Sequence, residues 1–398
     1  MGGGGVLLSI FLSLNTVGAF AEGTVFTGII NLLPDSFVLP SIGLINIVYG
    51  NYSSVELGAI NVVESSLFGA QAGIVNIVGQ STQGAQIGLF LNSNYDDMVG
   101  AQIGSVNING GETTGLQIGL YNEVADILTG VQAGGFNFVG GRYTDGDQIG
   151  IINMSSGVFT GRQTGGINSL KEGINGLQSG IINYSKNFVE GGQIGAINVV
   201  TGSLTGLQLG LFNYTESVDD GLPIGLFSVV RDNGYFALET SYSNLSLDLR
   251  IISGLWYFYS GVSLAVSIAE IPSVSISFSL GSLIPILNNV FYNSAYFVPD
   301  IRFVMPITRY ILPLILDEKT YNMVKEYMDV FSFSALVSPK FGFYLTKNVM
   351  LAAGPTFALE FNPDYIYPNF ESVAAYIHEP DLRFVLGFEV LIRYELIY

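Results

Sequence analysis

The sequence contains no cysteine and only one histidine among its 398 residues. The lack of cysteine excludes disulfide bonds, thiolate zinc sites and a cysteine nucleophile. A single histidine excludes a two-histidine metal motif and leaves little scope for histidine-based acid–base catalysis. Lysine and arginine total 14 against 32 acidic residues, for a net charge of −18, which argues against a nucleic-acid partner because phosphate binding needs clustered basic side chains. The composition therefore points away from an enzyme.

Charged residues make up only 12% of the chain, against about 25% in an average soluble domain. Hydrophobic residues make up 49%, which excludes disorder. The composition changes along the chain: 43 of the 50 glycines precede residue 229, whereas 10 of the 13 prolines follow it. We therefore predict two architectures that meet at residues 228 and 229.

The first 21 residues resemble a secretory signal peptide. An apolar run, Val6 to Leu14, is followed by the small-x-small triplet Ala19-Phe20-Ala21 that signal peptidase cleaves. The run is shorter than the roughly 20 residues that a membrane-spanning helix needs. Met1 to Gly5 has no basic residue, which departs from the usual signal-peptide start. We expect an exported protein with residues 1–21 as its signal peptide.

Residues 22–228 contain a fifteen-residue repeat with the pattern G-x-Q-x-G-x-φ-N, where φ is apolar. Its clear copies are Gly100–Asn107, Gly115–Asn122, Gly130–Asn137, Gly146–Asn153, Gly161–Asn168, Gly176–Asn183, Gly191–Asn198 and Gly206–Asn213. Weaker copies end at Asn31, Asn46, Asn61, Asn76 and Asn92, and a degenerate one runs from Gly221 to Ser228. Single residues are inserted before Asn92 and Asn153. A register held this long indicates a repeat architecture.

The period favours a parallel β-solenoid with one repeat per coil. The glycine density excludes a helix, and an antiparallel meander would repeat every two strands, or thirty residues. In an extended strand the Gln and the Asn of one repeat lie on opposite faces. Equivalent Asn side chains, and equivalent Gln side chains, would stack about 4.8 Å apart and form hydrogen-bonded ladders. We expect these amides to be scaffold; the alternative is a flat repetitive face that binds a lattice such as ice or a glycan.

Residues 229–398 alternate between apolar and polar positions, the pattern of β-strands with two different faces. In the last segment Phe388 and Val390 share one parity, whereas Glu389 and Arg393 share the other. We predict an antiparallel barrel of the outer-membrane type with about eight strands and an interior filled by side chains. The parity of Phe388 would face lipid, and ion pairs such as Asp248 with Arg250 and Arg393 with Glu395 would point into the lumen. The candidate strands are residues 234–243, 244–252, 254–268, 272–284, 295–306, 329–346, 348–361 and 382–398, and residues 314–328 are expected to form a short helix. A soluble barrel or sandwich remains the alternative for this region.

The repeat units followed by this alternating region resemble the surface-repeat proteins of spirochaetes and related bacteria. The repeats cover about half of the chain and are the more specific part of the match. The aromatic ending, Tyr394 to Tyr398, is similar to the C-terminal recognition signal of outer-membrane barrels. The resemblance implies a place in the cell envelope and supplies no catalytic residues.

The sequence predicts no catalytic, cofactor-binding or metal-binding residues. His378 lies in a proline-rich loop, Pro363 to Pro380, where we expect a solvated side chain because no serine and orienting acid converge on it. The acidic pairs Asp96-Asp97, Asp145/Asp147 and Asp219-Asp220 lie in the returns between repeats. They lack the regular glycine–aspartate repeat of calcium-binding rolls and are expected to be solvated turns.

We therefore expect a non-enzymatic protein of the outer membrane or cell surface, without a cofactor, that serves in display, adhesion or envelope structure. Its expected partners are outer-membrane lipid and, as an alternative, a host or envelope macromolecule, but no nucleic acid. The alternative function is an outer-membrane channel in which the repeats form part of the barrel wall.

Overall fold

The computed structural model describes residues 25–243, 246–267, 274–287, 295–307, 333–361, 378–379 and 382–396, in which every regular element is a β-strand. The predicted signal peptide and the predicted short helix at 314–328 lie outside these ranges. Residues 1–202 and 203–398 form two compact units. The predicted combination of a parallel solenoid and a closed eight-stranded antiparallel barrel is confirmed.

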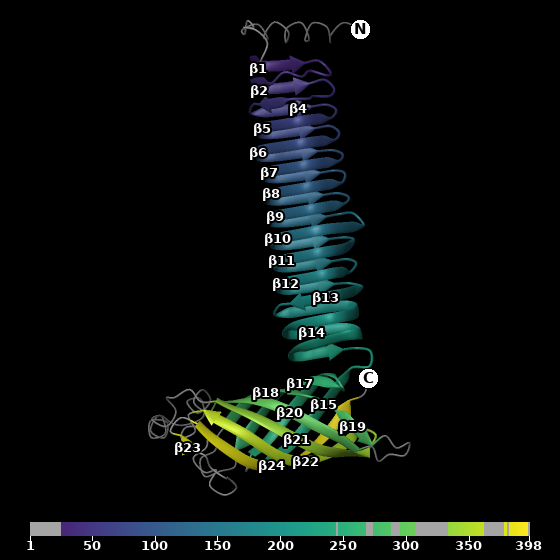
Figure 1. Ribbon diagram of the computed structural model, residues 1–398, viewed down its shortest axis with the longest axis vertical. Helices are drawn as coiled ribbons and strands as arrows, with labels where there is room; N and C mark the ends of the chain where they lie inside the picture. Colours follow the sequence, from purple (N-terminus) through teal and green to yellow (C-terminus); the bar gives the residue numbers. More distant parts are fainter. Residues whose placement is uncertain are drawn as a thin grey trace, which may run out of the picture. The chain divides into compact units, whose positions relative to one another are not determined.

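The solenoid is a stack of about twelve turns whose strands pair in parallel (Figure 1). Its strands are β1 (Phe26–Leu33), β2 (Ser41–Val48), β3 (Val55–Leu57), β4 (Ile60–Val63), β5 (Leu67–Val78), β6 (Thr82–Asn94), β7 (Met98–Asn109), β8 (Thr113–Val124), β9 (Leu128–Val139), β10 (Tyr143–Ser155), β11 (Val158–Leu170), β12 (Ile174–Ser185), β13 (Phe188–Ile194) and β14 (Ile197–Val230). Each repeat pairs with the next in register, so that Gln102 faces Gln117 and Asn107 faces Asn122.

The Gln and the Asn of a repeat do not lie on opposite faces, and that expectation was wrong. Gln102 and Asn107 are both fully buried inside the coil. Pairing passes from Gly150–Gly165 directly to Ile152–Ile167, so the residue after the second glycine, here Ile151, sits at a corner and points outward. At the corner, one residue is added without reversing the direction in which the following side chains point. As a result, two side chains five positions apart both turn inward.

The buried amides form two ladders along the stack, as predicted. Each Asn Nδ2 donates to the Asn Oδ1 of the following coil, at 2.6–2.8 Å from Asn31 to Asn198. Each Gln Nε2 donates to the Gln Oε1 of the preceding coil, at 2.6–3.0 Å from Gln193 to Gln71. In most coils the second amide proton reaches a backbone carbonyl, as in Gln102 to Ile108 and Asn107 to Ile118. Most amide donors of the ladders are therefore fully bonded, and the two ladders run in opposite directions.

Glycine is required where consecutive coils approach most closely. A Cβ placed on Gly134 would lie 1.7 Å from the carbonyl oxygen of Gly119. At the first glycine of the repeat, Gly115 has φ +140°, and a Cβ there would lie 1.9 Å from the Gly100 carbonyl oxygen. The two conserved glycine columns of the repeat thus follow from the close approach of coils and from a backbone conformation that other residues adopt rarely.

The antiparallel sheet closes on itself because its first strand, β15, pairs with its last long strand, β24. Its wall strands are β15 (Tyr235–Ser243), β16 (Ser246–Leu255), β17 (Phe258–Ser267), β18 (Val274–Gly281), β20 (Ala295–Pro306), β21 (Phe333–Thr346), β22 (Val349–Phe361) and β24 (Leu382–Leu396). They correspond one to one to the eight predicted segments. Two short strands, β19 (Ile284–Leu287) and β23 (His378–Glu379), were not predicted.

The change from parallel to antiparallel pairing falls between Val230, where β14 ends, and Tyr235, where β15 begins. This point lies just after the composition boundary at residues 228 and 229. The division into compact units falls earlier, after Gly202, so that the last part of β14 belongs to the same unit as the barrel strands.

Removal of one ladder amide should destabilise the solenoid. Asn122 is fully buried, accepts from Asn107 and donates to Asn137 and Ala133. We expect Asn122→Ala to lower the free energy of unfolding by about 1–3 kcal/mol, because buried donors and acceptors lose their partners. Thr114→Ala, at an exposed position of the same coil, should change it by less than about 0.5 kcal/mol. Urea titration followed by circular dichroism measures both free energies of unfolding. Equal stability of the two variants would show that the Asn ladder does not stabilise the solenoid.

Candidate functional site

The barrel has charged residues inside and apolar residues outside. On β24, Glu389 and Arg393 are fully buried in the lumen, whereas Phe388 and Ile392 point outward and are 55% and 54% exposed. The same holds on the other strands: the outward residues include Leu249 on β16, Phe303 on β20 and Phe341 on β21. The predicted assignment of the two parities of β24 is confirmed.

One part of the lumen is held together by Arg393. Its Nε and Nη2 donate to Glu239 Oε2 on β15, at 2.8 and 2.6 Å. Its remaining donors reach the hydroxyls of Tyr235 (3.1 Å) and Tyr259 (3.0 Å), and its guanidinium lies over the Tyr259 ring, 4.9 Å from the centroid. Glu395 accepts from the hydroxyls of Tyr235 and Tyr344. Sequence proximity had suggested an Arg393–Glu395 ion pair, but the partners of both groups come from other strands.

A second network joins β16, β20, β21 and β24 through Asp300 and Glu389. Lys340 Nζ donates to Asp300 Oδ2 at 2.7 Å and to Glu389 Oε2 at 3.0 Å. Arg302 also donates to Glu389, and Arg250 donates to Asp300 at 2.9 Å. The predicted pairing of Asp248 with Arg250 is present at 3.4 Å. Each cation therefore faces at least one carboxylate, the condition under which buried charges are tolerated.

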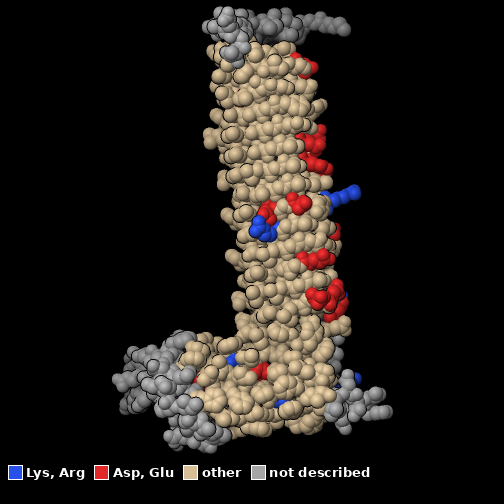
Figure 2. All heavy atoms as spheres, in the orientation of Figure 1, with Lys and Arg blue, Asp and Glu red and all other residues tan. Residues whose placement is uncertain are grey.

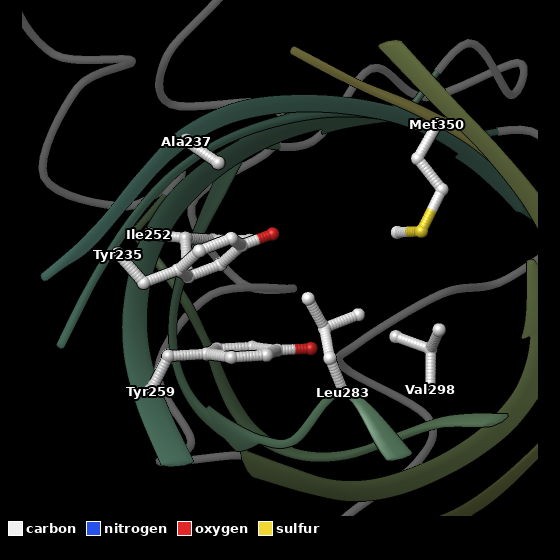
Figure 3. Close-up of a cluster of buried hydrophobic side chains, with 7 residues drawn as sticks. All are labelled: Tyr235, Ala237, Ile252, Tyr259, Leu283, Val298 and Met350. Atoms are coloured by element: carbon white, nitrogen blue, oxygen red, sulfur yellow. The ribbon is translucent and has the colours of Figure 1, made fainter. Parts of the chain in front are cut away.

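The two ends of the lumen differ. At one end, a cluster of apolar and tyrosine side chains fills the interior: Tyr235, Ala237, Ile252, Tyr259, Leu283, Val298 and Met350 (Figure 3). Toward the other end, a cavity of about 60 Å³ is lined by small and polar side chains, among them Ser275, Ser277, Asp248 and Glu360. Among the described residues, side chains therefore fill the first end of the lumen, as expected, whereas the second end holds a cavity.

The aromatic run at residues 256–259 divides between the two sides of the barrel. Trp256 and Tyr257 form the turn between β16 and β17, are 47% and 44% exposed, and pack edge to face with ring centroids 5.5 Å apart. Tyr259 is fully buried in the lumen. The first two residues match the amphipathic position expected for an interfacial aromatic, whereas Tyr259 belongs to the buried network.

Asp96 and Asp97 lie in a return, as predicted, but Asp145 and Asp147 lie on strand β10 and Asp219 and Asp220 on strand β14, so the predicted placement of these two pairs in returns was wrong. Asp97 Oδ1 accepts the backbone amide of Glu112 at 2.9 Å, and Asp147 forms a salt bridge with Arg162 at 2.7 Å. Asp219 and Asp220 are exposed. Arg162 lowers the pKa of the Asp147 carboxyl below its usual value. Within the described ranges, no group of three or more His, Asp or Glu side chains could hold a metal ion.

His378 forms the short strand β23 with Glu379, paired to Arg383 and Leu382 of β24. Its side chain lies outside the described part of the structure. The predicted loop around it, Pro363 to Pro380, is otherwise outside the described residues.

Glu56 occupies the Gln column of the solenoid and was not singled out from the sequence, although alignment of the repeats places it there. It is fully buried, and its Oε2 accepts from Gln71 Nε2 at 2.8 Å, which makes it the last acceptor of the Gln ladder. Its Oε1 has no hydrogen-bond partner among the described residues. Burial raises the pKa of the Glu56 carboxyl from 4.5 to about 8, and the bond from Gln71 offsets part of that rise.

The raised pKa predicts a solenoid that loses stability as the pH rises. The folded state keeps the proton of Glu56 up to about pH 8, whereas the unfolded chain releases it near 4.5, so stability falls progressively between these values. We expect Glu56→Gln to remove a pH-dependent loss on the order of a few kcal/mol between pH 5 and 8. Urea titrations at the two pH values measure this difference.

Glu64→Gln, at an exposed carboxyl in a return, is the matched control and should leave the pH dependence of wild type intact. The same pH dependence in Glu56→Gln and wild type would mean that Glu56 ionises as an ordinary carboxyl.

No helix in the described ranges is long and apolar enough to cross a membrane. Comparisons with protein-family models, with curated proteins and with solved structures find no match to this chain. The function therefore has to be inferred from the fold and from the distribution of polar and apolar side chains.

Proposed function

We propose that the protein is a non-enzymatic component of a bacterial outer membrane, in which lipid surrounds the barrel and the solenoid serves in display, adhesion or envelope structure. One observation carries the proposal: the barrel buries its charges and exposes its large apolar side chains. Water around such a barrel would contact a continuous apolar belt, which soluble monomers rarely expose. Lipid around it would satisfy the outer surface, and the closed sheet leaves no unpaired edge.

Strand length and side-chain placement support the same location. Membrane-spanning strands need about 9–11 residues, and the wall strands other than β18 have between 9 and 15. The exposed Trp256 and Tyr257 suit an interfacial position. Residues 1–21 would supply the export signal that this location requires.

The repeats support a structural role rather than a chemical one. Their Gln and Asn side chains, which dominate the polar groups of the repeat, are buried in the two ladders and are not presented to a substrate. Among the described residues, Arg250, Arg302, Lys340 and Arg393 are each paired with lumen carboxylates, so these cations neutralise the interior of the barrel. The buried amide ladders and the paired lumen charges both fit a structural, non-enzymatic surface protein.

The channel alternative predicts a conducting pore, and the side chains that fill one end of the lumen argue against it. The repeats pair in a parallel sheet of their own, and the barrel wall begins at β15. We expect the full-length protein in planar lipid bilayers to show no steady single-channel conductance, because Arg250, Lys340 and Arg393 cross the lumen in paired networks. A stable, ohmic conductance would favour the channel.

A matched pair of valines on β24 tests the membrane location. Val390 points outward near the middle of the strand, whereas Val385 points inward and lines the polar cavity with Asp248 and Glu360. We expect Val390→Lys to prevent stable insertion, because a lysine facing lipid at mid-depth costs about 2–4 kcal/mol. Val385→Lys should insert far better, since its ammonium can reach carboxylates of the cavity.

The assay is recovery in the membrane fraction together with the heat-dependent gel shift of a folded barrel. Val390→Leu controls for any change at that position. If both lysine variants were recovered folded in the soluble fraction, the barrel would be a soluble sheet and the proposed location would be wrong.

A further inference from the structure

Three rows of outward side chains run along the solenoid on either side of the corner. In each repeat they are the residue before the second glycine, the residue after it, and the apolar residue before the Asn. In the coil of β8 these are Ile118, Leu120 and Tyr121, and in the coil of β10 Ile149, Ile151 and Ile152. None of the three rows contains a charged residue from Thr27 to Ile197. The rows therefore form an uncharged, mainly apolar ridge, here called the corner ridge.

The middle row of the corner ridge alternates in size from coil to coil. Its bulky members, Leu89, Leu120, Ile151 and Ile181, are 66–74% exposed. The small members between them are Ser105, Gly135, Gly166 and Ala196. With coils about 4.8 Å apart, bulky side chains recur every ~9.6 Å with a gap between each two.

Stacking of the coils does not exclude bulky residues in consecutive coils of this row. Ile29 and Leu44 occupy the same row in adjacent coils, as do Ile74 and Leu89, and all four are exposed. Bulky neighbours therefore fit one above the other at the corner. At Gly135 and Gly166 the preceding coil itself favours glycine, because a Cβ there would lie 2.9 and 3.0 Å from the carbonyl oxygens of Leu120 and Ile151. Ser105 and Ala196 do carry a Cβ, so this contact alone does not set the size of the small members. Whatever its origin, the alternation gives the outer surface a regular series of bulky side chains and gaps.

We propose that the corner ridge binds the corner ridge of a second copy of this chain, antiparallel, with bulky residues of one copy in the gaps of the other. A two-fold axis between the coils of Gly135 and Ile151 brings Gly135 against the partner's Ile151 and Leu120 against the partner's Gly166. The same axis brings Ser105 against the partner's Ile181 and Leu89 against the partner's Ala196. Interdigitation of large and small side chains is how packed interfaces fill space.

A second copy is favoured over other occupants because it has the same repeat. A lipid or detergent surface has no ~9.6 Å corrugation for the row to match. A parallel copy related by a two-fold axis along the stack would set bulky residues against bulky residues at one coil and gaps against gaps at the next. The returns at the other end of each coil carry exposed acids such as Asp96, Asp126 and Glu112, and Figure 2 shows carboxylates gathered along one edge of the stack. Repulsion between such edges leaves the uncharged ridge as the face for self-association.

The size of the ridge predicts a reversible dimer. Eight coils overlap in this arrangement, about 38 Å at ~4.8 Å per coil, and three rows cover ~15 Å across. The contact is then about 600 Å² per copy, at the lower end for specific interfaces. The dimer does not depend on the proposed membrane location, because its residues all belong to the solenoid.

Single-cysteine variants test the arrangement directly, since the chain has no cysteine of its own. Full-length Ser105→Cys and Ile181→Cys proteins, one carrying a mass tag, are mixed in mild detergent solution and oxidised, which requires no insertion into lipid. We expect the mixed 105–181 dimer to form at least tenfold faster than either self-linked dimer. Glu112→Cys with Ile181→Cys, which combines the acidic edge with the ridge, is the control. Predominant self-linked dimers, or a mixed dimer no faster than the control, would overturn the antiparallel pairing.

Filling the gaps of the middle row distinguishes shape complementarity from nonspecific hydrophobic association. We expect Ser105→Leu/Ala196→Leu to weaken dimerisation at least tenfold in sedimentation velocity, although it adds apolar surface. Thr114→Leu/Thr129→Leu adds the same two side chains at exposed positions away from the corner and should leave dimerisation unchanged. Tighter association of the gap-filled variant would show that the ridge attracts apolar surfaces without regard to shape and would overturn the proposal.

Discussion

The solenoid depends on hydrogen bonds between identical amide side chains in consecutive coils. An Asn or Gln buried without partners would cost several kcal/mol, so every coil needs a coil above and below that presents the same amide at the same place. The Asn donors point toward higher residue numbers and the Gln donors toward lower ones. Opposed ladders keep the side-chain dipoles from adding along the stack, while each ladder retains the mutual polarisation of a hydrogen-bonded chain.

The barrel also pairs polar side chains in its interior, through charges instead of amides. In the solenoid the amides share the interior with apolar side chains such as Val124, Leu128 and Val139. In the barrel the partners come from strands far apart in the sequence, such as Glu239 with Arg393 and Asp300 with Lys340. Both units leave much apolar surface outside. In the barrel that surface is a belt suited to lipid, whereas in the solenoid it is a corrugated ridge suited to a copy of itself. The contrast lies in shape, because lipid conforms to any profile and a folded partner does not.

Periodicity made most of the fold predictable. A period of fifteen implied parallel coils and ladders, and alternation located the eight wall strands and the inward parity of β24. The corner was missed because strict alternation was applied across Gly104 to Val106, where the backbone turns. The predicted Arg393–Glu395 pair was wrong. The two residues share a face of β24, but Arg393 bonds to Glu239 on the adjacent strand instead. Glu56 was detectable as a carboxyl in the Gln column, but only burial reveals the effect on its pKa.

The two insertions in the repeat show that the Asn ladder stays in register even where a coil is one residue longer. The extra residue before Asn92 sits at the corner, where Leu89 and Phe90 are both exposed, and pairing resumes at Leu91. The extra residue before Asn153 falls in the return between β9 and β10, since the first paired residues, Leu128 and Thr144, are already offset by sixteen. Across both insertions the amides still meet at 2.8 Å, from Asn76 to Asn92 and from Asn137 to Asn153. Coil length therefore varies where side chains face outward, and the ladder positions are what the sequence conserves from coil to coil.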